Sequence, residues 1–179
     1  LGDQRSLRIS NLGAGQVASW VDVLYDLHRD TETKGYFVVH SMDDHPVPTI
    51  AARTYNLDVS GGTFGQNLKV FTPDDLVAVG EIANIAGVAH SPSLDIGFRS
   101  NLGLLNTAVD TATQVEVRLY DTTGALVGSR ETWLTEGQFW QINDVFSWLG
   151  AGDASMDGSL QVEVLAGGSV AVYGSEVDN

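Results

Sequence analysis

The sequence lacks cysteine and has few basic residues, and both absences exclude classes of function. Without cysteine the chain has no disulfide, no thiolate metal site and no cysteine nucleophile. Nine Lys and Arg residues stand against 23 Asp and Glu residues, so the formal net charge is −14. Nucleic-acid backbones and anionic lipid surfaces are bound by clustered basic side chains. Neither is therefore an expected partner.

Long hydrophobic runs are also missing. No apolar stretch reaches the roughly 18 to 20 residues that a membrane-spanning helix requires, and we expect no signal peptide in this sequence. We therefore expect no membrane insertion. The chain begins at Leu1 rather than at methionine, so we expect a mature or excised fragment. Apolar residues make up 43% of the sequence and charged residues 18%, which is enough apolar material for a packed core.

Three pairs of similar segments recur in the same order, which indicates an internal repeat. The pairs are 10–13 with 100–103, 21–26 with 115–121, and 35–56 with 158–179. They divide the chain into a shortened first repeat at 1–62, connecting strands and a short helix at 63–97, and a complete second repeat at 98–179. A unit of about 50 residues buries little surface. We therefore expect the first repeat to pack on the second, or to be completed by strands of the connector.

Strict alternation of apolar and polar residues predicts antiparallel strands in the second repeat. Apolar residues alternate with Glu116 and Arg118 in 115–119, and 160–164 has the same period. The Thr-Thr-Gly turn after the first strand predicts a hairpin to 126–134. Gly167 and Gly168 predict a second hairpin, which would join the 160–164 strand to 170–177. By their match to the second repeat, 21–26 and 36–39 are expected to be strands as well.

Helix signals are few. Asn143 and Asp144 can cap a short helix through 145–149, which Gly150 would end. Thr72 followed by Pro73 at the first helical position predicts another short helix. The predicted fold class is all-β, an antiparallel and immunoglobulin-like β-sandwich with two unequal repeats packed together and one or two short helices.

Several segments resemble a tandem repeat of large exported bacterial proteins. In the second repeat these segments are FRSNLGLLN at 98–106, VRLYD at 117–121, QINDVF at 141–146 and VAVYGSEVDN at 170–179. The link between successive units is resembled by two earlier segments, RTYN at 53–56 and GTFGQ at 62–66. The resemblance implies an accessory β-sandwich module beside catalytic or surface domains, with a secreted or cell-surface location. It brings no assigned catalytic residue.

The best metal candidate is the set His40, Asp43, Asp44 and His45, because two imidazoles and two carboxylates lie within six residues. Zinc accepts such donors, so the set could serve a metal-dependent enzyme. The repeat match offers another explanation. It places Asp43, Asp44 and His45 on a turn, where aspartate bonds the local backbone and faces solvent.

Four aromatic residues are the carbohydrate-binding candidates: Trp133, Phe139, Trp140 and Trp148. Aromatic faces stack on sugar rings, and a β-sheet can present such faces as a platform. Phe139 and Trp140 are adjacent, so on a strand they point to opposite faces. The alternative is that Trp140 and Trp148 pack into the core beneath the short helix, because large aromatics dominate cores by area.

Motifs for catalysis are absent from the sequence. It has no His-Glu-x-x-His, no Gly-x-Ser-x-Gly and no phosphate-binding loop. We therefore expect a non-catalytic module without cofactors, which acts as a spacer, a stabiliser or a protein-interaction surface of an exported bacterial protein. Its expected partners are neighbouring domains or another protein, with carbohydrate as the alternative ligand. Exposed edge strands would allow a homodimer.

Overall fold

The computed structural model describes residues 6–9, 12–28, 35–42, 45–57, 63–93, 96–153 and 155–178. Its contacts divide the chain into two units, Leu1–Val38 and Val39–Asn179. Strands account for 46% of the structure and helices for 7%. The predicted all-β class is therefore confirmed.

The described part of the first unit contains a helix where the repeat match predicts a strand. Helix α1 spans Val23–His28. Asp22 immediately precedes it: its Oδ1 accepts a hydrogen bond from the Tyr25 N–H at 2.9 Å, and its carbonyl accepts one from the Asp26 N–H at 2.9 Å. Aspartate favours this capping geometry. The prediction of a strand at 21–26 is therefore wrong.

The expected strand at 36–39 is also wrong, because these residues have no regular secondary structure. Their match in the second repeat lies in a strand that is paired on both sides. At 36–39 the structure describes no neighbouring strand that supplies such pairing, and a strand without neighbours is unstable in water. Further along the chain, β1 (Ala52–Leu57) and β2 (Thr63–Leu68) form an antiparallel hairpin.

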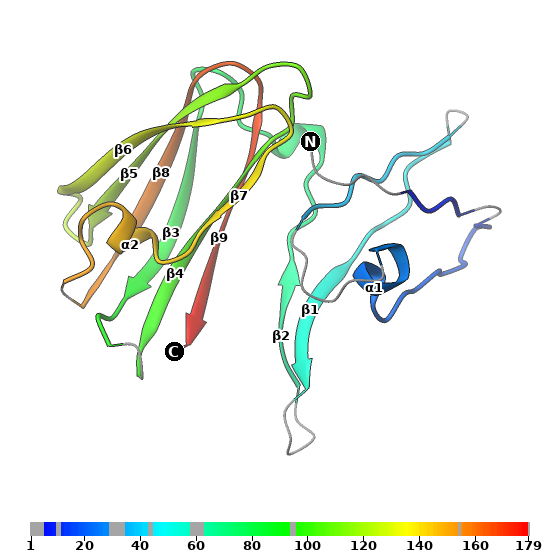
Figure 1. Ribbon diagram of the computed structural model, residues 1–179, viewed down its shortest axis with the longest axis horizontal. Coiled ribbons are helices and arrows are strands. Elements are labelled where there is room, and N and C mark those ends of the chain that lie inside the picture. Colours follow the sequence, from blue (N-terminus) through cyan, green and yellow to red (C-terminus); the bar gives the residue numbers. More distant parts are fainter. Residues whose placement is uncertain are drawn as a thin grey trace. The chain divides into compact units, whose positions relative to one another are not determined.

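Seven strands form one curled sheet that closes into a β-sandwich (Figure 1). They are β3 (Ile82–His90), β4 (Phe98–Asn106), β5 (Thr113–Asp121), β6 (Leu126–Leu134), β7 (Phe139–Ile142), β8 (Met156–Ala166) and β9 (Val170–Asp178). The order is β6-β5-β8-β3-β4-β7, and β9 pairs with β4. Strands β3 and β4 share the single register pair His90 and Arg99, so the sheet bends there. One layer is then β6-β5-β8-β3, and the other is β7-β4-β9.

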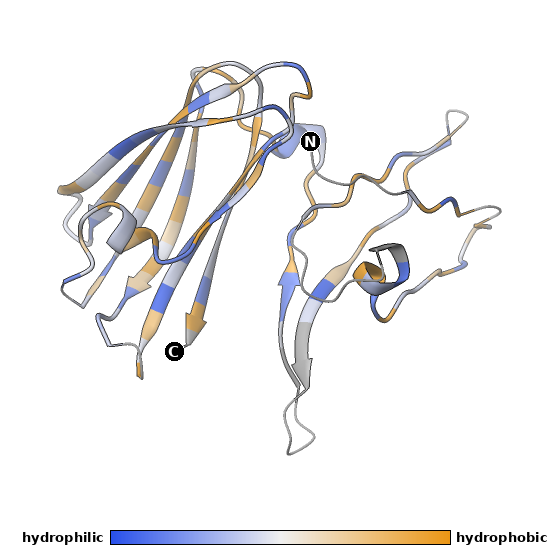
Figure 2. Cartoon of the chain, in the orientation of Figure 1, coloured by the Kyte–Doolittle hydropathy of each residue, from blue (hydrophilic) through white to orange (hydrophobic). Residues whose placement is uncertain are grey.

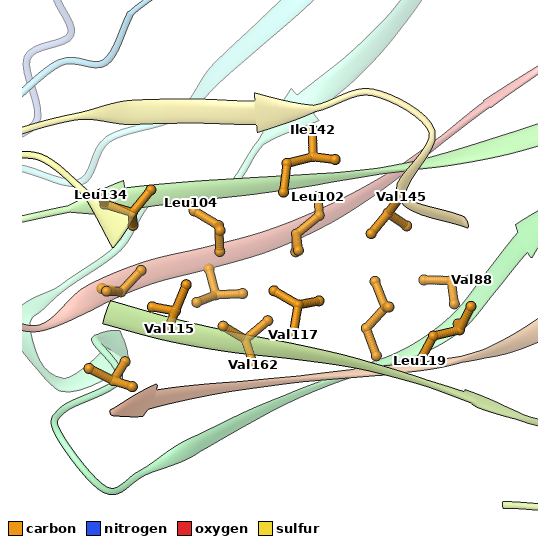
Figure 3. Close-up of a cluster of buried hydrophobic side chains, with 14 of the residues drawn as sticks. Val88, Leu102, Leu104, Val115, Val117, Leu119, Leu134, Ile142, Val145 and Val162 are labelled. Carbon is orange, nitrogen blue, oxygen red and sulfur yellow. The ribbon is translucent and has the colours of Figure 1, made fainter. Parts of the chain in front are cut away.

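The core lies between these two layers (Figure 3). Inward side chains of β5 and β8 are fully buried, and they face Leu102 and Leu104 of β4, which are also fully buried. Residues of opposite hydropathy alternate along the strands of the sandwich, as Figure 2 shows. The half-buried strands predicted from the alternation are therefore confirmed at 115–119 and 160–164.

One of the two predicted hairpins is confirmed and the other is wrong. The turn after Asp121 joins β5 to β6, which pair antiparallel. Gly167 and Gly168 join β8 to β9, but these strands do not pair with each other. Both edges of β8 are already occupied by β5 and β3, so the chain crosses to the other layer and β9 pairs with β4. Gly167 makes this crossing with a φ of 98°.

Both short helices predicted for the later part of the chain are confirmed. A 3₁₀ helix, η1, spans Pro73–Asp75, and the Asp75 carboxylate accepts hydrogen bonds from the Thr72 N–H and hydroxyl at 2.8 and 2.7 Å. Helix α2 spans Val145–Trp148, with Asp144 as its N-cap. Within the described ranges, the helices are all too short or too polar to cross a membrane.

Candidate functional site

The four predicted sugar-binding aromatics do not share one surface. Trp133 lies on β6, opposite Gln114 of β5, and 58% of its surface is exposed. The next residue, Leu134, is fully buried in the core. Because neighbours on a strand point to opposite faces, Trp133 lies on the outward face of the β6-β5-β8-β3 layer.

Trp140 of β7 and Trp148, the last residue of α2, contact each other. Their rings meet edge to face, with centroids 5.7 Å apart and planes at 87°. The guanidinium carbon of Arg130 lies 5.0 Å from the Trp148 ring centroid. Both tryptophans are half-buried and pack against the core. This is the packing role that the sequence analysis offers as the alternative to sugar binding.

Phe139 points away from Trp140, as its position on a strand predicts, and its neighbour is Tyr173 of β9. The two ring centroids are 6.4 Å apart and their planes differ by 7°, so the rings are nearly parallel. The Tyr173 hydroxyl donates a hydrogen bond to Gln141 Oε1 at 3.2 Å. Burial raises the pKa of the Tyr173 hydroxyl.

Gly103 of β4 makes room for this arrangement. It lies opposite Gln141 on one side and Tyr173 on the other. A Cβ atom on Gly103 would overlap Cε1 of the Tyr173 ring, so the ring occupies the space that a side chain would take. Leu102 and Leu104, on either side of Gly103, point into the core. Phe139, Gln141 and Tyr173 therefore lie on the outward face of the β7-β4-β9 layer, and we call them the aromatic platform.

The metal candidate stays a prediction. His40 and His45 are exposed, whereas Asp43 and Asp44 lie outside the described residues. Across the part of the chain that the structure describes, no three His, Asp or Glu side chains come together in a way that could hold a metal ion.

A buried histidine that carries no sequence motif ties α2 to the sandwich. His90 of β3 is 6% exposed, and its ring stacks on Phe146 with centroids 5.4 Å apart. Its Nε2 lies 2.9 Å from the Gly152 carbonyl oxygen. Its Nδ1 lies 3.0 Å from Asp144 Oδ1, without the alignment of a hydrogen bond.

Asp144 is the centre of the same network. Its carboxylate accepts hydrogen bonds from the Ser147 hydroxyl at 2.5 Å and the Ser147 N–H at 3.3 Å. Its own N–H donates to Asn101 Oδ1 at 3.1 Å. Asp144 has a φ of 54°, in the left-handed region that non-glycine residues rarely adopt. The carboxylate lies between the histidine and the serine, so the network does not place the imidazole where it could activate the serine hydroxyl.

Arg118 holds together the outward face of the larger layer. Its Nη2 donates to Glu116 Oε2 on its own strand and to Glu163 Oε2 of β8, the latter at 2.6 Å. The hydrogen bonds to Glu116 and then Glu163 raise the pKa of Arg118. All three side chains are half-buried, and the ion pairs join β5 to β8.

An open pocket of about 470 Å³ lies where β3, β4, β5 and β8 end or begin. Phe98, Asp121 and Asp157 are among the residues that line it. The Asp121 carboxylate accepts hydrogen bonds from the Thr123 hydroxyl and N–H at 2.6 and 2.8 Å. The hydroxyl bond is the main cause of the lowered pKa of Asp121. This acid therefore stabilises its own turn.

Known proteins give little help with function. A scan of protein-family models and a search of curated proteins each found no match. Among solved structures, the chain is similar to the Anabaena sensory rhodopsin transducer, with 17% identity and a TM-score of 0.41 over 55% of this chain and 99% of that one. A similarity at this level carries no argument about function.

Sequence reasoning missed Tyr173 and His90, and each depends on long-range register. Tyr173 meets Phe139 only because β4 lies between β7 and β9. His90 meets Asp144 across 54 positions of sequence, through the closure of the two layers. The glycine at 103, which lies between two buried leucines, is the one local signal that a side chain from another strand fills its place.

Proposed function

We propose that this chain is a non-catalytic β-sandwich module of an exported bacterial protein, which serves as a spacer, a stabiliser or a protein-interaction surface. The proposal is carried by the hydrogen bonds that the polar side chains of the 98–106 segment make. The segment's residues Ser100, Asn101 and Asn106, which are part of the resemblance to repeats of exported proteins, form hydrogen bonds within the sandwich. The exported location rests on that resemblance.

Ser100 and Asn101 hold β4 to its neighbours. Ser100 is 1% exposed, and its hydroxyl accepts a hydrogen bond from the Ala89 N–H at 2.8 Å while donating to the Ala89 carbonyl at 2.9 Å. The side chain thereby joins β4 to β3 near the bend of the sheet. Asn101 is 4% exposed and accepts from the N–H of Asp144, the N-cap of α2.

Asn106, at the end of β4, connects the β4–β5 loop, the β6–β7 loop and the adjoining ends of β5 and β6. Its amide nitrogen donates to the carbonyls of Thr111, Leu134 and Thr135 at 2.8, 3.4 and 3.0 Å. Its Oδ1 accepts from the Ala108 N–H at 3.1 Å and the Thr113 hydroxyl at 3.0 Å. The side chain is fully buried. A buried polar group with all its partners rigidifies a fold, which is the property a spacer or stabiliser needs.

The surface charge supports the same proposal. With a net charge of −14, copies of the module repel one another and resist non-specific association. A repeated module in a large exported protein benefits from this property, because neighbouring units in one chain are held at high local concentration.

A substrate screen on the whole chain tests the absence of catalysis. Chromogenic esters, phosphates and glycosides should be hydrolysed no faster by the wild-type chain than by the His90→Gln and Asp144→Asn variants. These two residues belong to the buried network that most resembles a reactive cluster. Turnover that either variant abolishes, with the circular-dichroism spectrum and melting temperature unchanged, would contradict the proposal.

A further inference from the structure

We propose that the aromatic platform, formed by Phe139, Gln141 and Tyr173, binds the apolar face of a sugar ring in a neutral glycan. This inference goes beyond a structural role, because it assigns a ligand class to one face of the module.

The first argument is the shape of the surface. Phe139 and Tyr173 lie on the outward face of the layer with planes 7° apart and centroids separated by 6.4 Å. The two rings are therefore nearly parallel, and their apolar faces have the same inclination on this side of the layer. Both residues are half-buried, so part of each residue stays accessible. The axial C–H groups of a pyranose form a flat apolar face, which packs against aromatic faces.

The second argument is the polar rim of the platform. Gln141 Oε1 accepts from the Tyr173 hydroxyl, and Gln141 Nε2 donates to Asn143 Oδ1 at 2.8 Å. Each primary amide has two N–H donors, and a phenol oxygen accepts as well as donates. The rim therefore offers both donors and acceptors to sugar hydroxyls. An apolar surface with a few fixed polar groups is the usual composition of a small-molecule site.

The third argument is that the platform is already in place. The Tyr173 ring lies over Gly103 and is fixed at its hydroxyl by Gln141. A side chain that is ordered before binding loses little conformational entropy on binding. The three platform residues are uncharged and the chain carries a net charge of −14, which disfavours acidic glycans. The ligand class is therefore a neutral glycan.

Affinity electrophoresis of the whole chain tests this proposal. Native gels would contain β-glucan, xylan or galactomannan as neutral probes, and polygalacturonate as the acidic comparison. We expect at least one neutral polysaccharide to retard the chain. Phe139→Ala and Gln141→Ala should each weaken that binding about tenfold or more. Trp133→Ala, which removes an exposed aromatic from the other layer, should change it less than twofold.

Tyr173 needs a second measurement because it also covers Gly103. Tyr173→Leu is therefore compared with Phe139→Leu, and the melting temperature of each is recorded with its binding. If Phe139→Leu loses binding while its melting temperature stays unchanged, the loss is not caused by destabilisation of the fold, and the result supports sugar binding by the aromatic platform. Three results would overturn the proposal: no retardation in any neutral gel, retardation that survives in the Phe139→Leu/Gln141→Ala variant, or a loss of binding caused by Trp133→Ala alone.

Discussion

At the level of single residues, Gly103 and Tyr173 depend on each other. A methyl group at position 103 would overlap the tyrosine ring, so Gly103→Ala forces the ring out of its place. We expect the free energy of unfolding to fall by about 1–3 kcal/mol, the usual cost of overpacking. Urea denaturation monitored by circular dichroism would measure this loss.

The control for this prediction is a double-mutant cycle. When Tyr173→Ala has already removed the ring, Gly103→Ala should cost clearly less than it does in the wild-type background, because the overlap no longer exists. If the glycine substitution costs the same in both backgrounds, the ring is not the reason that position 103 is glycine.

Tyr173 should also make stability depend on pH in the alkaline range. Burial raises the pKa of its hydroxyl in the folded state above the ordinary value of about 10. The folded chain then holds a proton that the unfolded chain releases. This contribution to stability is fully present below about pH 10 and is lost as the pH rises through the folded-state pKa.

We therefore expect Tyr173→Phe, which has no hydroxyl to ionise, to lose less stability than the wild type above about pH 10. Urea midpoints of both proteins between about pH 8 and pH 11 would show this as diverging curves. Parallel curves across that range would contradict the assigned role of the buried hydroxyl.

At the level of elements, Gly167 directs the crossing from β8 to β9. Gly167 and Gly124 both have positive φ, at 98° and 85°. A Cβ on Gly167 would overlap the Ala112 carbonyl oxygen, whereas nothing lies within 4 Å of the equivalent position on Gly124. Both alanine substitutions should cost about 1 kcal/mol for the backbone conformation. Gly167→Ala should cost a further 1–3 kcal/mol or so, and equal urea midpoints for the two variants would exclude the steric effect.

Asn106 should be among the most costly residues of the sandwich to replace. Asn106→Ala removes the side-chain donor of the Thr111 carbonyl and leaves the Thr135 carbonyl with the Gln138 N–H alone. We expect a loss of about 2–4 kcal/mol in thermal or urea unfolding. The control is Asn84→Ala, because Asn84 is exposed and accepts one hydrogen bond from Gln161. That variant should stay within about 0.5 kcal/mol of the wild type, and a similar loss in both would contradict the role of Asn106.

Short sequence patterns predict the helices and strands of this chain well where neighbouring residues alone determine the secondary structure. The period-two pattern predicts β5 and β8, and capping residues predict η1 and α2. The same kind of pattern fails at 21–26, because Asp22 caps a helix there. It fails again at Gly167 and Gly168, because two glycines predict a turn without determining which strand the next segment pairs with.

The candidate site is harder to predict than the elements for the same reason. Phe139 is recognisable in the sequence as an aromatic on a strand. Its partner Tyr173 is not, because their contact requires the register of β7 and β9 on β4. The pairing of strands that lie far apart in the sequence depends on the packing of the whole core, and the sequence of either strand alone does not determine it.

At the level of the whole molecule, the buried residues are unevenly distributed along the chain. Among the residues that the structure describes, the buried ones begin at Val88. The earlier part of the chain instead has large apolar side chains in exposed positions, such as Val17 and Val21, which are 88% and 83% exposed. The stability of the sandwich therefore comes from its own strands.

Deletion of residues 1–38 should then leave the sandwich intact. We expect the melting temperature to change by less than about 2–4 °C, which corresponds to a stability change below roughly 1 kcal/mol. Near-ultraviolet circular dichroism would report on this, because the Trp140 and Trp148 pair lies within the sandwich. Deletion of 170–179 is the comparison. It removes β9, which pairs with β4 along its whole length and supplies Val170 and Val172 to the core, so the cooperative transition should be lost. A large drop in melting temperature after the first deletion would show that the early segment contributes to the sandwich after all.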